Sequence, residues 1–267
     1  MATVDVVSDG CRLRCRVDGP VSGDALLLSN SLGTTLDLWE PQVASFAERH
    51  RVIRYDTRGH GGSAAPAGEY TIDQLGRDAL AVLDAAGAER AHVCGMSLGG
   101  ITGMWLAVHA RHRVTTLVLA CTGARIGSDA LWEERIRQVR TTGLEAVADS
   151  AMARWFTPRF RVAHPDNVAA FRRTLASGSP QGYIGCCAAL RDADLRGEIS
   201  RIDAPTLVVA GTEDMATPPA TGETLRHTIR GARMVTLDAA HLANVEQADD
   251  FNEHVLALIN QRGSTHE

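Results

Sequence analysis

The chain has 267 residues and a mass of 28.6 kDa, the size of one large domain, with 45% hydrophobic and 22% charged residues. Its formal net charge is −5 and no basic block occurs, so we expect no nucleic-acid partner and no anionic membrane surface. All 27 residues in the Lys+Arg count are arginine, which excludes a lysine Schiff base and a P-loop lysine. A small molecule is the expected partner.

Cysteine usage and the N-terminal sequence predict the compartment. The six cysteines form no C-x-x-C pair, and the adjacent Cys186 and Cys187 lack the histidine spacing of a zinc site. We therefore expect reduced thiols and no metal. The sequence shows neither a signal-peptide pattern nor a run of 18 apolar residues, so we expect a cytoplasmic protein without a membrane span.

Short apolar runs alternate with amphipathic stretches along the chain. Val4–Val7 and Cys11–Val17 predict an antiparallel hairpin at a sheet edge. Six further strands are predicted at Ala25–Leu28, Arg51–Tyr55, Ala91–Cys94, Val114–Ala120, Thr206–Ala210 and Met234–Leu237. Helical periodicity occurs at Ile72–Ala86 and Phe251–Ile259. The pattern predicts an α/β fold with a mostly parallel eight-stranded sheet and helices on both faces.

The strand pattern stops from about Gly123 to Ser200, where successive helices are predicted. We interpret residues 123–200 as a helical lid, inserted into a core that residues 1–122 and 201–267 form. The lid contains 11 arginines and nine carboxylates, so it is the positive part of an acidic protein. This charge distribution suits an anionic substrate better than a neutral one.

The most specific motif is Gly95-Met96-Ser97-Leu98-Gly99, a G-x-S-x-G sequence between the strand Ala91–Cys94 and the helix-compatible Gly100–His109. Such a strand-to-helix turn exposes a nucleophilic serine at a helix N-terminus, where developing negative charge is favoured. The pentapeptide alone is also compatible with a simple glycine-rich turn. Its context predicts Ser97 as a catalytic nucleophile.

A serine nucleophile needs a histidine base and an acid that orients it. Asp214 follows the strand Thr206–Ala210, and His241 follows the next strand, so the chain order is Ser, Asp, His, as in the α/β-hydrolases. Glu213 and Asp238 are competing acids, but Asp238 lies only three residues before the histidine. His60, in a glycine-rich loop, is the rival base, and we expect it to be structural.

An oxyanion hole needs two backbone N–H donors, one after the nucleophile and one from the loop after the third strand. Leu98 and Leu32 fit these positions. The second donor lies in Asn30-Ser31-Leu32-Gly33, where many α/β-hydrolases have His-Gly. Asn-Ser in place of His-Gly therefore helps to distinguish this chain from many other α/β-hydrolases.

The sequence resembles the 3-oxoadipate enol-lactonases of bacterial aromatic degradation. The matching motifs are Leu28-Ser29-Asn30-Ser31-Leu32-Gly33-Thr34, Arg54-Tyr55-Asp56-Thr57-Arg58-Gly59-His60-Gly61, Cys94-Gly95-Met96-Ser97-Leu98-Gly99-Gly100, Cys186-Cys187-Ala188-Ala189, Ala204-Pro205-Thr206 and Ala240-His241-Leu242-Ala243-Asn244-Val245-Glu246-Gln247. The similarity runs from about Ala25 to Phe251 and includes the lid.

The resemblance implies hydrolysis of 3-oxoadipate enol-lactone to 3-oxoadipate in the β-ketoadipate pathway, through an acyl-enzyme and without metal or organic cofactor. The substrate is a small lactone with an anionic acetate arm, which a lid cation would bind. Arg125 is the first choice, and Arg135 and Arg154 are the alternatives. Trp132 is expected to wall the ring, and Ser31 to add a hydroxyl donor.

Two other functions stay open at this point. One is a different lactonase or carboxylesterase that uses the same triad, including peroxidative or carbon–carbon hydrolase variants. The other is a ligand-binding protein of this fold without catalysis, which the presence of all three triad residues disfavours. The sequence leaves a homo-oligomer possible.

Overall fold

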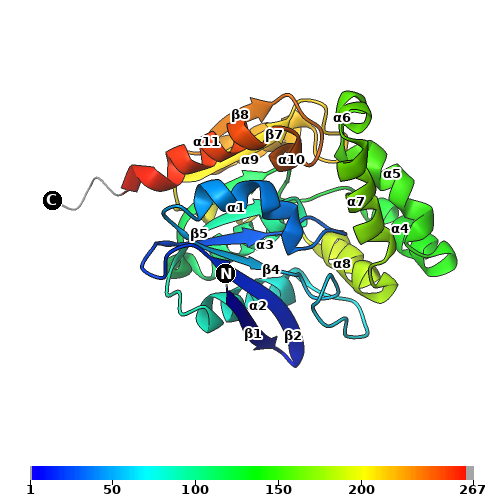
Figure 1. Cartoon of the computed structure of the whole chain (residues 1–267), viewed down its shortest axis with the longest axis horizontal. Helices are drawn as coiled ribbons and strands as arrows, with labels where there is room; N and C mark the ends of the chain where they lie inside the picture. The colour runs from blue at the N-terminus through cyan, green and yellow to red at the C-terminus, as the bar shows by residue number, and fades with distance from the viewer. Residues whose placement is uncertain (1, 263–267) are drawn as a thin grey trace.

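The computed structural model describes residues 2–262. Their centre is an eight-stranded sheet, and helices surround it (Figure 1). The strands are β1 (Ala2–Ser8), β2 (Cys11–Asp18), β3 (Ala25–Ser29), β4 (Arg51–Tyr55), β5 (Ala91–Met96), β6 (Val114–Ala120), β7 (Thr206–Gly211) and β8 (Arg233–Leu237). Their order in the sheet is β1-β2-β4-β3-β5-β6-β7-β8. Only the pairs β1/β2 and β2/β4 are antiparallel. The expected parallel sheet with an edge hairpin is confirmed.

The burial of each strand reflects its place in the sheet. Every residue of β3, β5 and β7 is buried, as expected for strands covered by helices on both faces. The edge strand β1 is mostly exposed, and only Val6 and Ser8 of it are buried. The apolar core therefore lies around the central parallel strands.

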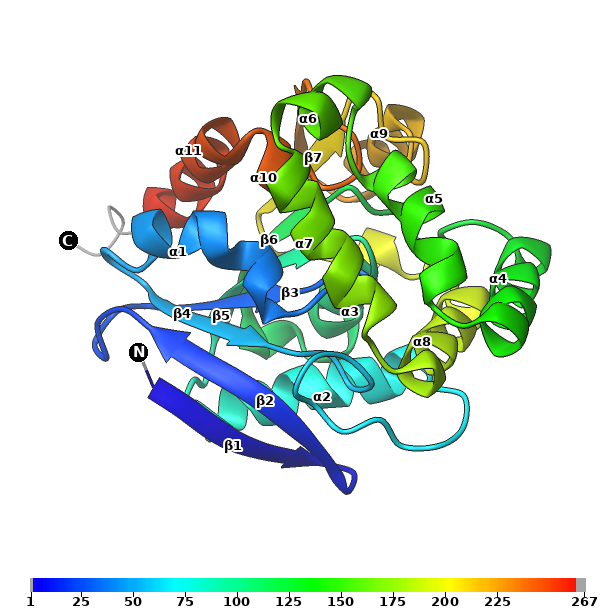
Figure 2. The same ribbon diagram turned by 45° about the vertical axis from the view of Figure 1, so that its right-hand side comes forward.

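Helices cover both faces of this sheet. The core α-helices are α1 (Glu40–Phe46), α2 (Ile72–Ala85), α3 (Leu98–His109), α9 (Pro219–Thr228), α10 (Ala243–Glu246) and α11 (Ala248–Ile259). Short 3₁₀-helices are η1 (Leu36–Trp39), η2 (Arg111–Arg113), η3 (Ile199–Arg201) and η4 (Asn260–Arg262). Helices α1 and α11 pack together on one face, and α2 and α3 on the other (Figure 2).

Local sequence explains where helix α2 begins and how closely helix α3 packs. Thr71 caps α2, because its side chain accepts from the Gln74 amide while the Gln74 side chain accepts from the Thr71 amide. Helix α3 is buried along almost its whole length, and glycine allows this close packing. A Cβ atom at Gly100 would lie 2.5 Å from the Thr122 side chain. Small residues therefore seat α3 directly behind the strand ends.

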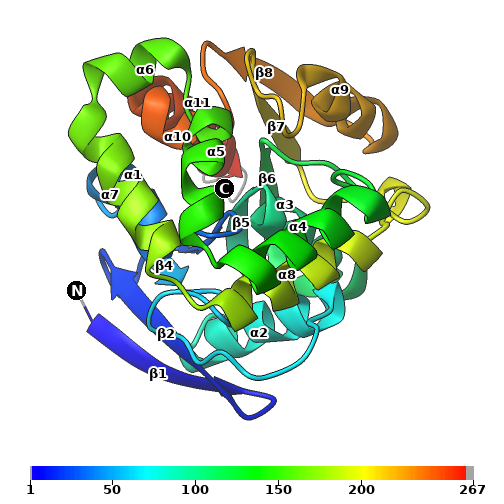
Figure 3. The ribbon, with the colours of Figure 1, turned by 90° about the vertical axis from the view of Figure 1, so that its right-hand side faces the viewer.

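Five helices lie between β6 and β7 in the chain, at the carboxyl end of the parallel strands (Figure 3). They are α4 (Asp129–Thr142), α5 (Glu145–Trp155), α6 (Pro158–Ala163), α7 (Pro165–Ala176) and α8 (Pro180–Asp192). Helix α8 contacts the core through glycine, since a Cβ atom at Gly59 would lie 2.3 Å from the Cα of Gly182. We keep the term lid for residues 123–200, and their division from the core stays a prediction.

The boundaries on either side of Ser97 differ from the sequence expectation, which ended the strand at Cys94 and began the helix at Gly100. Strand β5 continues to Met96, and α3 already begins at Leu98, so the turn between them is the single residue Ser97. Helices α1, α9 and α10 were not predicted. Within residues 2–262, no helix has the length and apolarity needed to cross a bilayer.

Candidate active site

Ser97 occupies a strained turn between β5 and α3. Its φ of 55° and ψ of −112° are unusual for a residue other than glycine. Glycine on both sides makes room for this turn, because a Cβ atom at Gly95 would lie 2.1 Å from the Gly99 carbonyl oxygen, and one at Gly99 would lie 2.1 Å from that of Ser29. The G-x-S-x-G spacing therefore has a steric cause.

Hydrogen bonds to the backbone hold Ser97 in place. Its amide donates to the Ala120 carbonyl at 2.9 Å, and its own carbonyl accepts from Thr122 Oγ1 at 2.7 Å. The residue is only 5% exposed. The serine backbone is thus fixed by the last residue of β6 and by the loop that follows it.

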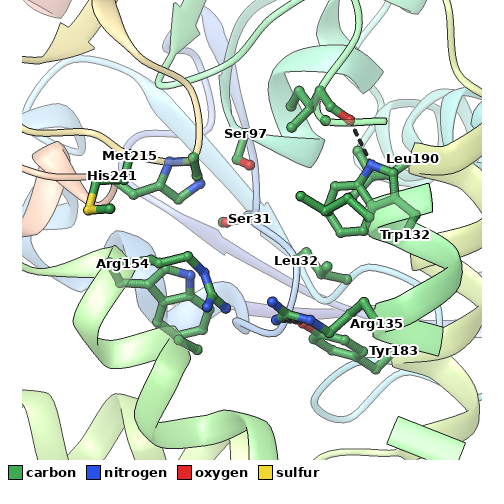
Figure 4. A pocket seen from close by; sticks show the side chains of 16 residues that line it. Ser31, Leu32, Ser97, Trp132, Arg135, Arg154, Tyr183, Leu190, Met215 and His241 are labelled. Atoms are coloured by element: carbon green, nitrogen blue, oxygen red, sulfur yellow. Dashed lines mark hydrogen bonds between the residues drawn. The ribbon is translucent and has the colours of Figure 1, made fainter. Parts of the chain in front are cut away.

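Asp214 and His241 meet at the carboxyl ends of β7 and β8. His241 Nδ1 lies 2.8 Å from Asp214 Oδ2, and both side chains are buried. An ionised carboxylate only accepts hydrogen bonds, so Nδ1 is the donor and Nε2 carries the lone pair. The imidazole and the Ser97 hydroxyl face the same cavity (Figure 4). The pair can therefore supply a general base next to a nucleophile.

The surroundings of Asp214 keep it ionised. Burial by itself raises its pKa, but His241 and hydrogen bonds from Thr217 outweigh that effect, so the pKa lies below its ordinary value. Thr217 Oγ1 donates to Asp214 Oδ2 at 2.6 Å, and the amides of Ala216 and Thr217 donate to Oδ1. The carboxylate is therefore available to orient the imidazole.

The competing residues are engaged elsewhere. Glu213 and Asp238 both form ion pairs with Arg159 at the surface. His60 Nε2 accepts from the Gly33 amide at 2.9 Å, and His60 Nδ1 lies 3.2 Å from the Arg58 carbonyl oxygen. Geometry therefore favours Asp214 as the acid partner and gives His60 no contact with the nucleophile.

The backbone amides of Leu98 and Leu32 are the expected donors of an oxyanion hole. Leu98 is the first residue of α3, where amides have no partner within the helix. Leu32 lies in the turn after β3 and lines the cavity that also contains Ser97. Within residues 2–262, neither amide donates to another group of the chain. Both donors remain available to a bound oxygen.

The cavity has a volume of about 160 Å³ and lies between the strand ends and the lid. This is smaller than the sites of drug-sized ligands and suits a small molecule. Its walls include Ser31, Trp132, Tyr183 and Met215 (Figure 4). Trp132 Nε1 donates to the Ile126 carbonyl at 2.6 Å, which fixes the ring as part of the wall.

Two arginines of the lid line the same cavity. Arg135 Nη1 donates to the Tyr183 hydroxyl at 3.4 Å, and Arg154 comes from the neighbouring helix α5. No carboxylate in residues 2–262 lies within 4.0 Å of either guanidinium, whereas Arg172 of α7 pairs with two. Burial and the charge of Arg135 lower the pKa of Arg154. Two uncompensated cations therefore face the cavity and would be stabilised by an anion.

Arg125 does not join this group, which changes the first choice for the carboxylate ligand. Its guanidinium binds Asp129 at 2.6 Å and Asp194 at 3.2 Å, and the residue borders a separate surface hollow beside α9. Both partners are carboxylates, so the charge of Arg125 is already neutralised. Of the three candidate arginines, Arg135 and Arg154 line the cavity and Arg125 does not.

Sequence reasoning missed Thr217, Thr122 and Tyr183. The sequence did contain a signal for Thr217, because a threonine three residues after an aspartate can donate a hydrogen bond to that aspartate in a local turn. Thr122 and Tyr183 had none, since their contacts join distant segments.

The described residues contain no group of three or more His, Cys, Asp or Glu side chains placed to hold a metal ion. All six cysteines are free and buried.

Comparison with known proteins defines the class. The model of a family described as alpha/beta hydrolase fold matches residues 24–248. The chain therefore belongs to the alpha/beta hydrolase family, as the fold and the strand-end arrangement of Ser97, Asp214 and His241 indicate.

Individual relatives narrow the comparison. 3-Oxoadipate enol-lactonase 2 of Acinetobacter baylyi is 44% identical over 241 residues, which cover 90% of each chain. The crystal structure of the enol-lactonase from Burkholderia xenovorans LB400 has a TM-score of 0.95 and 42% identity, and covers 96% of this chain and 100% of that one. A hydrolase from Pseudomonas aeruginosa PA01 has a TM-score of 0.93 and 44% identity, with 97% of each chain covered. The resemblance to the enol-lactonases is confirmed, and the chain is a hydrolase.

Proposed function

We propose that the protein hydrolyses 3-oxoadipate enol-lactone to 3-oxoadipate, with Ser97, His241 and Asp214 as a catalytic triad. One observation carries this proposal. A nucleophile, its base and two uncompensated arginines face one small cavity, which suits an ester that also bears a carboxylate. The similarity to enol-lactonases supports the same substrate and a place in aromatic catabolism.

Acylation begins when Ser97 Oγ attacks the ring carbonyl and His241 Nε2 takes its proton. Asp214 holds the imidazole by its Nδ1–H and stabilises the imidazolium that forms. The carbonyl oxygen becomes an oxyanion, which the Leu32 and Leu98 amides bind together with the N-terminal end of α3.

Collapse of the tetrahedral intermediate breaks the bond between the carbonyl carbon and the ring oxygen. The leaving group is an enolate, which leaves more readily than a simple alkoxide. It takes the proton that His241 Nε2 received from Ser97 and ketonises, so the imidazole is neutral again. The leaving group stays attached to the acyl chain, so the whole molecule is held as an ester of Ser97. Water then attacks this ester with His241 as base, and Ser97 is released with the second carboxylate of the product.

The acetate arm of the substrate would bind to Arg135 and Arg154. Guanidinium groups form charge-assisted hydrogen bonds to carboxylates, and both groups lack a carboxylate partner within residues 2–262. Trp132 would wall the ring and Ser31 would add a hydroxyl donor from the loop after β3. Selectivity would therefore reside in the lid.

Kinetics with purified protein test the proposal. We would compare kcat/KM on 3-oxoadipate enol-lactone, a neutral aryl acetate and an N-acyl homoserine lactone, with EDTA-treated enzyme alongside. The anionic lactone is expected to exceed the neutral substrates by about 10²-fold or more, because two charge-assisted contacts favour it. EDTA should have no effect. Equal rates on all three would favour the alternative of a general carboxylesterase. A cytoplasmic location and a homo-oligomer stay predictions.

A further inference from the structure

His60 lies beneath the turn that carries one oxyanion amide. It is 7% exposed, and its ring is held at both nitrogens. Nδ1 lies 3.2 Å from the Arg58 carbonyl oxygen, which only accepts, so Nδ1 carries the proton. Nε2 is then the acceptor for the Gly33 amide at 2.9 Å. With both nitrogens occupied, the ring has no free site for the chemistry of a substrate.

The amide that His60 accepts is at the centre of a tight turn. The Ser31 carbonyl accepts from the Thr34 amide at 3.2 Å and from Thr34 Oγ1 at 2.8 Å. Gly33 has a φ of +80°, whereas Leu32 is not among the described residues with positive φ. This combination defines a type II turn with Leu32 and Gly33 as its central residues.

Two successive peptide groups of this turn are held by different partners. In a trans peptide the C=O and N–H point in opposite directions, so the two bonds to the Ser31 carbonyl also direct the Leu32 N–H. The next peptide, between Leu32 and Gly33, is the one whose rotation converts a type II turn into type I. His60 holds the N–H of this peptide. Leu32 borders the reaction cavity, whereas Gly33 and His60 border a small hollow behind it.

The lid also packs against this turn. A Cβ atom at Gly33 would lie 2.8 Å from Leu175 Cδ1 and 3.2 Å from the Tyr183 ring. Gly33 is thus confined between lid side chains and His60. The hydrogen bond to His60 and the close packing of lid side chains both restrict the central peptide of the turn.

We propose that His60 is a positioning residue, which fixes the turn so that the Leu32 amide meets the developing oxyanion. The inference rests on the proposed serine-hydrolase function of the same site. His60 neither touches the substrate nor transfers a proton in this scheme. Its effect passes through the Gly33 amide and is felt when the tetrahedral intermediate forms.

Three variants separate positioning from simple support of the fold. His60→Gln can place an oxygen near the former Nε2 and accept from Gly33. His60→Asn reaches only the former Nδ1 position, and His60→Leu removes both polar contacts at similar volume. His50→Asn is the matched control, because His50 is also buried but lies before β4 and bonds Asn260. His60→Asn and His60→Leu are the loss variants, since neither can accept from the Gly33 amide. If one of them does not fold, the other is compared with His60→Gln.

Two measurements are made on each folded variant. One is kcat and KM for a neutral aryl acetate, which needs the oxyanion hole but no arginine. The other is the affinity for a trifluoromethyl ketone, which forms a tetrahedral adduct with serine, beside that for 3-oxoadipate, which forms none.

We expect His60→Asn or His60→Leu to lower kcat and ketone affinity by about 10- to 100-fold while KM and 3-oxoadipate affinity stay within about threefold. His60→Gln should stay within about fivefold of the parent. Equal weakening of ketone and dicarboxylate, or unchanged ketone affinity in a folded loss variant, overturns the inference but leaves the proposed function intact. A parent enzyme inactive on ester and lactone alike overturns both.

Discussion

The strand ends and the lid contribute polar groups to one cavity in opposite ways. At the strand ends the polar groups bond one another: Asp214 accepts hydrogen bonds from His241 and Thr217. On the lid wall, Arg135 and Arg154 face the cavity without a carboxylate partner in residues 2–262. A saturated hydrogen-bond network fixes geometry, whereas an uncompensated charge awaits a ligand. Under the proposed function, this difference places bond cleavage in the core and substrate choice in the lid.

The largest expected effect comes from the core. Ser97→Ala should lower kcat on the anionic lactone and on a neutral ester alike, by about 10⁴-fold or more, because the nucleophile serves both. Steady-state kinetics measure the loss, and circular dichroism and the unfolding midpoint check the fold. A folded variant that keeps a tenth of the parent activity would show that Ser97 is not the nucleophile.

The choice of acid gives the next effect. Asp214→Asn should lower kcat by about 10³- to 10⁴-fold, because an amide no longer enforces the tautomer of His241. Glu213→Gln is the adjacent control, since Glu213 pairs with Arg159 at the surface, and it should retain the parent rate. If Glu213→Gln proves the more damaging change, the assignment of the acid is reversed.

The lid should show a substrate-dependent effect. Arg135→Met and Arg154→Met should each lower kcat/KM on the enol-lactone by about 10- to 150-fold, the effect of roughly 1.5–3 kcal/mol, and spare a neutral aryl ester. Arg172→Met is the control from the same lid, because this arginine binds Glu145 and Asp149 at the surface. Arg125→Met is measured as well. A selective loss in Arg125→Met alone would return the carboxylate site to that residue.

The smallest effect concerns stability rather than turnover. Burial lowers the pKa of His60 from 6.5 to about 4, so the folded protein keeps the ring neutral where the unfolded chain binds a proton. Its contribution to stability is therefore full above pH 6.5 and is lost as the pH falls toward 4. Between pH 7 and pH 5 this residue should lower the free energy of unfolding by about 2 kcal/mol.

Urea unfolding of the parent and of His60→Gln at both pH values measures this effect. The difference in stability between the two proteins should shrink at pH 5 by the same amount, because glutamine does not titrate. If the difference in unfolding free energy between the two proteins is the same at pH 7 and pH 5, His60 titrates alike in the folded and unfolded states. The recognition arginines of the lid stay charged over this range, so the pH effect tests the core alone.

The sequence by itself predicted the sheet and the chemistry of its edge. The strands, the G-x-S-x-G turn and the order Ser97, Asp214, His241 depend on signals within a few residues, such as apolar runs and glycines that permit a strained φ. Because parallel strands end at one edge, residues that follow different strands meet there. That rule places the three residues together without knowledge of any single distance.

Only the tertiary structure decided which arginines face the cavity. Arg125 has the expected place in the chain, but Asp194, 69 residues later, reaches it and neutralises its charge. The lid helices α4 and α5 instead direct Arg135 and Arg154 inward, where Tyr183 from α8 contacts the first. No local pattern determines such contacts, because side-chain direction and charge pairing depend on how separate helices pack.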